Sequence, residues 1–273
     1  MNSENLIKRI DDRGIYYLTI NRPHVMNAFD ENLIKDLNDV FLELAINKEI
    51  RILVLSGEGK AFSAGGDLDW MRRMSDVSHS ENSKDSMKLA EMLYNLDTLP
   101  FPTIALVNGA AFGGGVGLVA ACDIAIGNNY SKFSLSEVRL GLIPSVISPY
   151  VVQAIGQRNS RYLFLTSAPI SSKEAYHIGL LNDYTESENL NDLLEKQLKN
   201  ILKGGPKALK SSKELISFVN GKVIDEEVMA ETAKRIADAR SSAERKEGID
   251  AFLQKENQIG RIRINDKKDF NSK

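Results

Sequence analysis

A stretch without charge is the feature that most constrains how this chain can fold. No charged residue occurs between Asp97 and Asp123, and residues 104–122 are apolar or glycine except for Asn108. Such a run has to be buried, either in a membrane or inside a protein core. Prolines precede the run, Asn108 with Gly109 gives a turn signal, and the glycines would weaken a spanning helix. The sequence therefore predicts a buried strand, a turn and a short buried helix rather than a membrane span.

Strand-like and helix-like patterns alternate through the first half of the chain. Short runs rich in apolar and β-branched residues predict strands at 15–20, 52–55, 103–107 and 123–126. The last two runs do not alternate with polar residues, which is typical of a parallel sheet covered by helices on both faces. Residues 30–47 carry apolar side chains at helical spacing after Asp30, a favourable N-cap. The first half is therefore predicted to be α/β.

The second half of the chain predicts a series of helices. They are expected at 189–203, 206–219, 224–239 and 242–254. Ser171 with Glu174, and Ser241 with Glu244, have the spacing of capping boxes. An α/β front followed by helices predicts a sheet core and a helical segment that packs on it or on another subunit. The polar tail at 265–273 predicts a mobile end.

Charge and cysteine content narrow the classes of function. The 273 residues include 35 Lys and Arg against 37 Asp and Glu, a net charge of -2. No basic field is therefore expected to attract nucleic acid, RNA included. A single cysteine, Cys122, cannot form an intrachain disulfide or a CxxC metal site, which favours a reducing compartment. Residues 1–14 lack the basic and apolar parts of a secretory signal, so a cytoplasmic location is expected.

Two loops rich in glycine follow predicted strands and lead into predicted helices. They span residues 57–68 and 108–117. Glycine lets backbone N–H groups approach a ligand, and a helix after Gly114 would add its positive dipole to a bound oxygen. Two such loops can form one anion hole, although glycine clusters also mark tight turns and close packing. Neither loop is a phosphate motif, because GxxxxGK[ST] is absent and the spacing does not match GxGxxG.

Several short motifs follow one another in a characteristic order. They are Asn21-Arg22-Pro23, Asn27-Ala28-Phe29, residues 61–68 (AFSAGGDL), Asn108-Gly109, residues 111–115 (AFGGG), residues 136–144 (SEVRLGLIP), residues 170–175 (ISSKEA), Gly179-Leu180-Leu181 and residues 245–252 (RKEGIDAF). Together they cover the chain from about residue 15 to residue 254. In this order they resemble the enoyl-CoA hydratase/isomerase family, also called crotonases.

The resemblance implies a fold and a class of ligand. It implies an α/β core of ββα turns arranged as a spiral, expected over residues 1–200. A helical C-terminal trimerisation segment is expected over residues 201–273, with assembly as a homotrimer or a dimer of trimers. The implied ligand is an acyl-CoA thioester, as in fatty acid metabolism, with coenzyme A as part of the substrate and no separate cofactor.

The resemblance also implies which residues form the site. The thioester oxygen would lie between the backbone N–H groups of Gly66 and Gly114. Negative charge develops on that oxygen as an enolate forms, and preorganised donors there contribute about 3 kcal/mol each. Residues matching the family's substrate-binding positions are His24, Met26, Lys60, Ala64, Gly66, Asp67, Leu68, Phe112, Gly113, Gly114 and Ser136.

Glu137 is the candidate acid/base. Its apolar neighbours at 133–135 and 140–144 could desolvate it and raise its pKa toward a useful working range. The alternative is an exposed glutamate that pairs with Arg139. The resemblance favours the first interpretation, because the family has a catalytic glutamate at the matching position.

Gly117 departs from the family pattern, because two-glutamate hydratases carry their second glutamate there. A single carboxylate leaves three functions open: hydration of a 2-enoyl-CoA, isomerisation of a 3-enoyl-CoA to the 2-enoyl form, and non-catalytic binding of an acyl-CoA. Residues 68–71 (LDWM), 113–118 (GGGVGL), 134–139 (SLSEVR) and 146–152 (VISPYVV) resemble more closely the bacterial 3-methylglutaconyl-CoA hydratase branch of leucine degradation. The distal carboxylate of that substrate would call for a cation, for which Arg72 and Arg73 are weak candidates. The favoured alternative is that both are solvated helix charges.

Other chemistries find little support in the sequence. His24, His79 and His177 form no HExxH motif or helical pair, so no metal site is expected. No serine lies in a GxSxG motif, so covalent catalysis is not expected. Trp70 and Met71 are predicted either to form a wall of the acyl pocket or to belong to the core.

Overall fold

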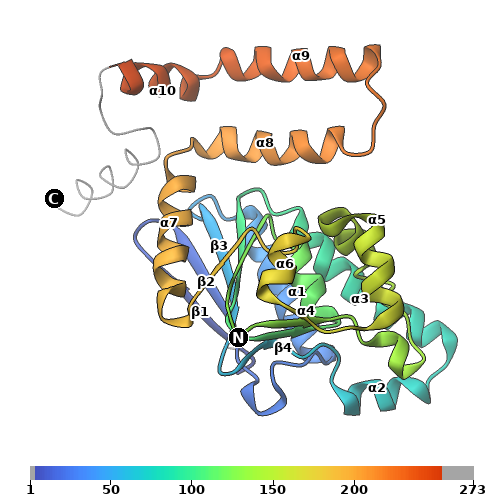
Figure 1. Cartoon of the computed structure of the whole chain (residues 1–273). Coiled ribbons are helices and arrows are strands. Elements are labelled where there is room, and N and C mark those ends of the chain that lie inside the picture. Colours follow the sequence, from blue (N-terminus) through green and yellow to red (C-terminus); the bar gives the residue numbers. More distant parts are fainter. Residues whose placement is uncertain (1–3, 254–273) are drawn as a thin grey trace. The chain divides into compact units, whose positions relative to one another are not determined.

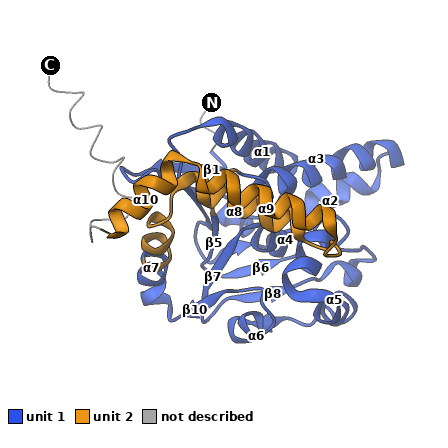
Figure 2. Ribbon diagram, turned by 90° about the horizontal axis from the view of Figure 1, so that it is seen from above, with its two compact units in different colours: residues 1–99, 103–195 blue, residues 100–102, 196–273 orange. Residues whose placement is uncertain are grey.

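The computed structural model describes residues 4–253 (Figure 1). The chain divides into two compact units, residues 1–99 with 103–195 and residues 100–102 with 196–273 (Figure 2). The domain boundary predicted after residue 200 falls inside helix α7 (Leu190–Leu202) and stays a prediction. The tail at 265–273, predicted to be mobile, lies outside the described residues.

A six-stranded sheet forms the centre of the first unit. Its strands, in spatial order, are β1 (Leu6–Ile10), β2 (Ile15–Ile20), β3 (Ile52–Gly57), β5 (Thr103–Val107), β7 (Ile124–Asn128) and β10 (Asp183–Thr185). β1 pairs with β2 antiparallel, and the other neighbours are parallel. The strands predicted near 15–20, 52–55, 103–107 and 123–126 are confirmed. β1 and β10 were not predicted, because β1 is mostly exposed and carries two charges while β10 is very short.

A smaller sheet continues three of these strands. Its order is β4 (Ala61–Ser63), β6 (Ala110–Phe112), β8 (Lys132–Ser134) and β9 (Ile170–Ser171). β3 leads through β4 into helix α2 (Leu68–Ser75), and β5 leads through β6 into helix α4 (Gly114–Ala121). The uncharged stretch forms the predicted strand (β5) and helix (α4), and the short strand β6 between them was not predicted. Of the helices described, none is long and apolar enough to cross a membrane.

The remaining helices of the first unit bury apolar faces and have defined starts. They are α1 (Glu31–Ile46), α3 (His79–Asp97), α5 (Ser148–Thr166) and α6 (Ser172–His177). Asp30 caps α1 as predicted, since the Leu33 N–H donates to its Oδ1 at 2.8 Å. The predicted capping box of Ser171 and Glu174 is confirmed at the start of α6. Helices α1 and α3 pack together in this unit.

The second unit contains α8 (Pro206–Val219), α9 (Glu226–Arg240) and α10 (Ala243–Leu253), close to the predicted helices. The predicted capping box of Ser241 with Glu244 is wrong. Ser242 caps α10, because its Oγ accepts from the Arg245 N–H at 3.1 Å. The Glu244 carboxylate instead accepts the backbone N–H groups of residues 207 and 208, at 3.1 and 2.8 Å, in the first turn of α8.

Asn27 fixes the loop that follows β2. It is fully buried, and its φ of 58° places it in the left-handed region that asparagine tolerates. Its Oδ1 accepts from the Arg22 N–H at 2.8 Å. Its Nδ2 donates to the carbonyl oxygens of Glu58 at 2.9 Å and Ala61 at 2.7 Å. One side chain therefore joins this loop to the turn between β3 and β4.

Substituting Asn27→Ala is expected to lower the free energy of unfolding by about 3 kcal/mol, because buried partners lose their hydrogen bonds and alanine disfavours a positive φ. Chemical denaturation followed by circular dichroism measures the loss. Asn47→Ala is the control, since Asn47 is exposed and only accepts from the Glu49 N–H at 2.9 Å. Equal losses in the two variants would show that Asn27 does not fix the loop.

Candidate functional site

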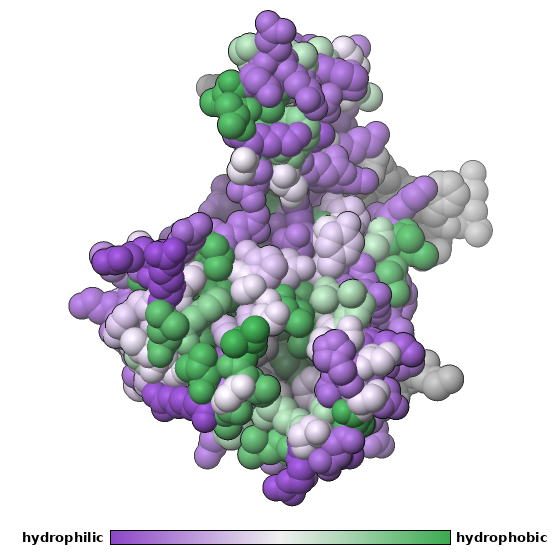
Figure 3. Space-filling view, turned by 90° about the vertical axis from the view of Figure 1, so that its right-hand side faces the viewer, coloured by the Kyte–Doolittle hydropathy of each residue, from purple (hydrophilic) through white to green (hydrophobic). Residues whose placement is uncertain are grey.

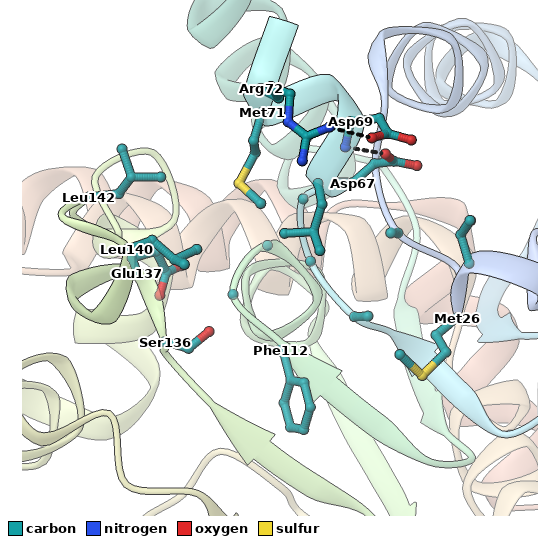
Figure 4. Close-up of a pocket in the computed structure, with 18 of the residues that line it drawn as sticks. Met26, Asp67, Asp69, Met71, Arg72, Phe112, Ser136, Glu137, Leu140 and Leu142 are labelled. Atoms are coloured by element: carbon teal, nitrogen blue, oxygen red, sulfur yellow. Dashed lines mark hydrogen bonds and ion pairs between the residues drawn. The ribbon is translucent and has the colours of Figure 1, made fainter. Parts of the chain in front are cut away.

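A cavity of about 610 Å³ opens where the loops after β2, β4, β6 and β8 meet in the first unit (Figure 4). All of the predicted site residues except Lys60 line it: His24, Met26, Ala64, Gly66, Asp67, Leu68, Phe112, Gly113, Gly114, Ser136 and Glu137. Lys60 lies exposed in the turn between β3 and β4, outside the lining. Segments that are far apart in the sequence therefore meet at one cavity.

The backbone around Gly66 turns one amide toward this cavity. Phe29 and Gly66 form a parallel bridge, in which the Phe29 N–H donates to Gly65 O at 2.7 Å and the Asp67 N–H donates to Phe29 O at 2.8 Å. Because N–H groups alternate in direction along an extended chain, the Gly66 N–H points away from Phe29. Within residues 4–253 it has no protein acceptor. This amide is available to a ligand.

Gly114 supplies a second available amide. It is the first residue of α4, and first-turn N–H groups have no acceptor within their own helix. No acceptor from another part of the described chain replaces it. A Cβ at this position would lie 2.6 Å from Cε2 of Phe29, whose ring is buried. The close packing of Phe29 therefore requires glycine at the helix start.

The two glycine loops touch through their backbones. Gly65 has a φ of 88°, and a Cβ there would lie 2.8 Å from Phe112 O and 3.6 Å from the Cα of Gly113. Gly113 also has a positive φ, of 48°. Only glycine suits such contacts and angles without strain. The Gly66 and Gly114 amides consequently line one cavity, and their shared donation to a single oxygen stays a prediction.

Arg22 and Asp67 hold the first loop in place. Asp67 caps α2, because its Oδ1 accepts from the Asp69 N–H at 3.0 Å. Its Oδ2 lies 3.4 Å from a guanidinium nitrogen of Arg22, and the same nitrogen lies 2.9 Å from the carboxylate of Asp30. The Arg22 side chain is only 11% exposed, so this pairing is shielded from water. The carboxylate after Gly66 therefore serves to position the loop.

Glu137 contrasts with the other carboxylates of the lining. Asp67 pairs with Arg22 and Asp69 with Arg72, whereas Glu137 Oε2 is buried without a hydrogen-bond partner among the described atoms. Burial raises the pKa of the Glu137 carboxyl, and a hydrogen bond from its own backbone N–H offsets part of the rise. Its unpaired carboxylate is the group of this cavity best suited to move protons.

The environment of Glu137 is thus the desolvated one that the sequence predicted. The alternative pairing with Arg139 is wrong, because Arg139 donates to the carbonyl oxygen of Ser167 at 3.1 Å. A Cβ on Gly113 would lie 3.1 Å from Glu137 Oε1, so the carboxylate lies directly against the second glycine loop. The candidate acid/base group and the available amides therefore line the same cavity.

No side chain fits at Gly117. A Cβ there would lie 2.3 Å from Cγ2 and 2.9 Å from Cβ of Ile147. Ile147 is only 3% exposed, so it has little freedom to move aside. Gly117 itself is buried and does not line the cavity. The space that a second carboxylate at position 117 would need is filled by the core residue Ile147.

The neighbouring helix α2 divides its side chains between the cavity and the surface. Met71 lines the cavity, which is the first of its two predicted roles, whereas Trp70 does not line it and is only half-buried, so neither predicted role is confirmed for Trp70. Arg72 lines it too, 3.7 Å from Asp69, with both side chains 82% exposed. Arg73 instead makes two 2.8 Å bonds to the carboxylate of Glu31. Of the two predicted cations, the cavity contains Arg72.

The sequence analysis missed part of the lining. The missed residues are Val25, Ala28, Gly65, Asp69, Leu140 and Leu142. Leu68, Leu140 and Leu142 are 69%, 57% and 49% exposed, so the rim is apolar. Apolar surface gathers around a hollow on the face that Figure 3 shows. The apolar run after Glu137 could have indicated the rim. Among residues 4–253, no group of His, Cys, Asp or Glu could hold a metal ion.

Comparison with known proteins identifies relatives that match most of the chain. Residues 11–259 match the family model of enoyl-CoA hydratase/isomerase. A Legionella pneumophila structure provisionally described as an enoyl-CoA hydratase/isomerase (crotonase) is 42% identical, with a TM-score of 0.88 over 94% of this chain and 99% of that one. An enoyl-CoA hydratase structure from Shewanella pealeana is 38% identical, with a TM-score of 0.89 over 93% and 95%.

A curated relative covers a similar extent. A crotonyl-CoA hydratase from Syntrophomonas wolfei is 30% identical over 257 residues, which are 93% of this chain and 97% of that protein. The structural neighbours confirm the predicted α/β crotonase fold with a helical C-terminal region.

Replacing Gly66 or Gly114 by alanine adds a methyl group at Cα, and the two substitutions should change the stability of the protein by different amounts. Gly114→Ala is expected to lower the free energy of unfolding by about 1–3 kcal/mol, because the new Cβ overlaps the buried Phe29 ring. Gly66→Ala is expected to lower it by less than about 1 kcal/mol, because its Cβ would meet the flexible Met71 side chain, at 3.2 Å from Sδ. Denaturant unfolding of both variants measures the difference. The reverse order would refute the assigned packing.

Proposed function

The chain belongs to the enoyl-CoA hydratase/isomerase family of enzymes, and on that basis we propose that it is an enoyl-CoA hydratase, a lyase that adds water across the 2,3-double bond of a 2-enoyl-CoA or removes it. The observation that carries the proposal is one cavity lined by two available main-chain amides and by the half-buried Glu137 carboxylate, whose Oε2 is buried without a hydrogen-bond partner among the described residues. The amides suit an oxygen that becomes negative, and the carboxylate suits proton transfer.

The proposed reaction passes through an enolate. Glu137 takes a proton from water as the water oxygen bonds to C3 of the substrate, and the electrons of the double bond move toward the thioester oxygen. The N–H groups of Gly66 and Gly114 stabilise the resulting negative charge. Glu137 then gives its proton to C2. The net change is addition of one water, and a raised pKa helps Glu137 to hold the proton between the two steps.

The chemistry of the lining residues suggests where the acyl chain and the coenzyme A end of the substrate would bind. The acyl chain would contact Met71, Leu140 and Leu142. The coenzyme A end would extend toward His24 and Lys60, which match family positions. Coenzyme A is part of the substrate, and the proposed steps use only groups of the protein, without a metal or redox cofactor.

Isomerisation is the second candidate, and the Gly117 environment favours it. Moving a double bond from the 3,4 to the 2,3 position needs one base that carries one proton between two carbons. Ile147 closes the position at which another carboxylate would help to hold water. A hydroxyacyl-CoA product distinguishes hydration from isomerisation.

The finer substrate that we propose is 3-methylglutaconyl-CoA, from leucine degradation. Its distal carboxylate would meet Arg72, the guanidinium in the lining. We also propose a homotrimer or a dimer of trimers. Exposed apolar side chains in the helical unit, Ile216, Met229 and Phe252, support a role in assembly. The single cysteine supports a reducing, cytoplasmic location.

Glu137→Gln is expected to lower kcat for hydration of crotonyl-CoA or 3-methylglutaconyl-CoA by about 10²–10⁴-fold, because the amide cannot accept and return the proton. Mass spectrometry of the products measures turnover and identifies the reaction. Glu91→Gln, at an exposed position on α3, is the matched control and should retain full activity. Near-normal turnover by Glu137→Gln would remove the proposed acid/base. Turnover of any enoyl-CoA by the natural chain excludes a non-catalytic binding role.

Arg72→Gln is expected to raise KM for 3-methylglutaconyl-CoA by about two- to fivefold and to leave KM for crotonyl-CoA unchanged, because an exposed ion pair contributes about 0.2–1 kcal/mol. Steady-state kinetics with both substrates measure this. Arg73→Gln is the matched control, since its guanidinium binds Glu31. Equal changes for the two substrates would contradict recognition of the distal carboxylate.

A further inference from the structure

We propose that the Ser136 hydroxyl, together with Glu137, holds the water that attacks C3. The inference rests on the hydratase function proposed above and deepens it, because it assigns a water-positioning role to a residue for which the family resemblance implied only substrate binding. The chemical question is how a site with a single unpaired carboxylate orients a water molecule.

Water needs more than one contact to be oriented. A carboxylate that accepts one hydrogen of a water molecule leaves the molecule free to rotate about that bond, so the oxygen lone pair is not aimed at C3. A second hydrogen-bonding group removes that freedom. Position 117 cannot supply it, because Ile147 occupies the space of any side chain there. The remaining candidates are the other polar groups of the lining.

Most of those groups are already engaged. Asp67 caps α2 and pairs with Arg22, and Asp69 pairs with Arg72. His24 also lines the cavity, and the proposed function assigns it to the coenzyme A end of the substrate. Ser136 carries the hydroxyl of the lining, and no hydrogen bond from the described residues engages it. Nearby hydroxyls outside the lining are used structurally. Ser63 donates to Asn27 O at 2.8 Å, and Ser134 donates to Ser167 O at 3.2 Å.

The backbone brings the Ser136 and Glu137 side chains to the same side. Consecutive residues of an extended strand point to opposite faces, and β8 ends at Ser134. At Ser136 φ is -90° and ψ is 5°, a bridge-region conformation that ends the alternation. Figure 4 shows the Ser136 hydroxyl directed into the cavity on the side where the Glu137 carboxylate lies. Adjacent residues thus present a hydroxyl and a carboxylate to one space.

In this proposal Ser136 accepts a hydrogen bond from the water and transfers no proton. One hydrogen of the water passes to Glu137 as the oxygen bonds to C3. The other hydrogen stays on the oxygen and donates to Ser136 Oγ throughout the attack. The proton held by Glu137 then bonds to C2, so the double bond is replaced by one C–O and one C–H bond. Ser136 begins and ends protonated.

The test compares two reactions of the same site. The first is hydration of crotonyl-CoA or 3-methylglutaconyl-CoA, whichever the natural chain turns over faster. The second is exchange of the C2 hydrogens of butyryl-CoA for deuterium in D₂O, followed by mass spectrometry. Exchange needs Glu137 and the available amides, but no attack by water on C3.

Ser136→Ala is expected to lower kcat for hydration by about tenfold or more and to change the exchange rate by less than about twofold, since one hydrogen bond to the water is lost. Ser136→Thr keeps the hydroxyl and should restore most of the hydration rate. Ser134→Ala removes a hydroxyl that bonds to Ser167 and should leave the ratio of the two rates unchanged.

The other outcomes are separable. Unchanged hydration in Ser136→Ala overturns the inference and leaves the hydratase function intact. An equal fall in hydration and exchange also overturns it, because Ser136 would then act by placing Glu137. If the natural chain exchanges the C2 hydrogens but hydrates neither enoyl-CoA, the hydratase function fails, and the inference fails with it.

Discussion

Direct contact between two glycine backbones is the constraint on which the site depends. Gly65 lies so close to Phe112 and Gly113 that a single added carbon would overlap the second loop. Each loop follows a short strand of the smaller sheet and leads into a helix. Because these two strands pair, the loops lie side by side, and glycine allows their backbones to touch. This contact brings the available amides of Gly66 and Gly114 to the same cavity. Their directions come from a strand bridge and a helix start, which are rigid elements.

The two carboxylates Asp67 and Glu137 line the same cavity but have different surroundings. Asp67 shares the Arg22 guanidinium with Asp30 and positions a loop, whereas Glu137 Oε2 has no partner among the described residues. Because burial raises the Glu137 pKa in the folded protein, its protonated form is favoured there, and stability is lost as the pH rises from the ordinary value of 4.5 through the raised one. Above the raised pKa the fold therefore contains an unfavourable carboxylate. That instability is the property that makes the group a useful base.

Sequence patterns predicted the features that depend on residues close together in the sequence, namely strands, helices and helix caps. The uncharged stretch became β5 and α4, and Asp30 and Ser171 cap the expected helices, because period and cap chemistry are local. Contacts over long sequence distances were not predictable in this way. Glu244 has capping-box spacing, yet it caps α8 through residues 207 and 208. Family resemblance located Gly66, Gly114 and Glu137, but the leucines of the rim are recognisable only once the fold is known.

Because Ile147 leaves no room for a side chain at position 117, the pKa of the candidate acid/base group, Glu137, has to be raised without a second carboxylate beside it. In a site with two adjacent carboxylates, repulsion between like charges raises one of the pKa values. Here Ile147 fills the space, and the rise at Glu137 comes from burial alone. Since Leu140 and Leu142 line the same cavity, the apolar rim would, under the proposed function, help to desolvate Glu137 as well as contact the acyl chain. A bound acyl chain would exclude further water and strengthen both effects, so substrate would complete the environment that its own reaction requires.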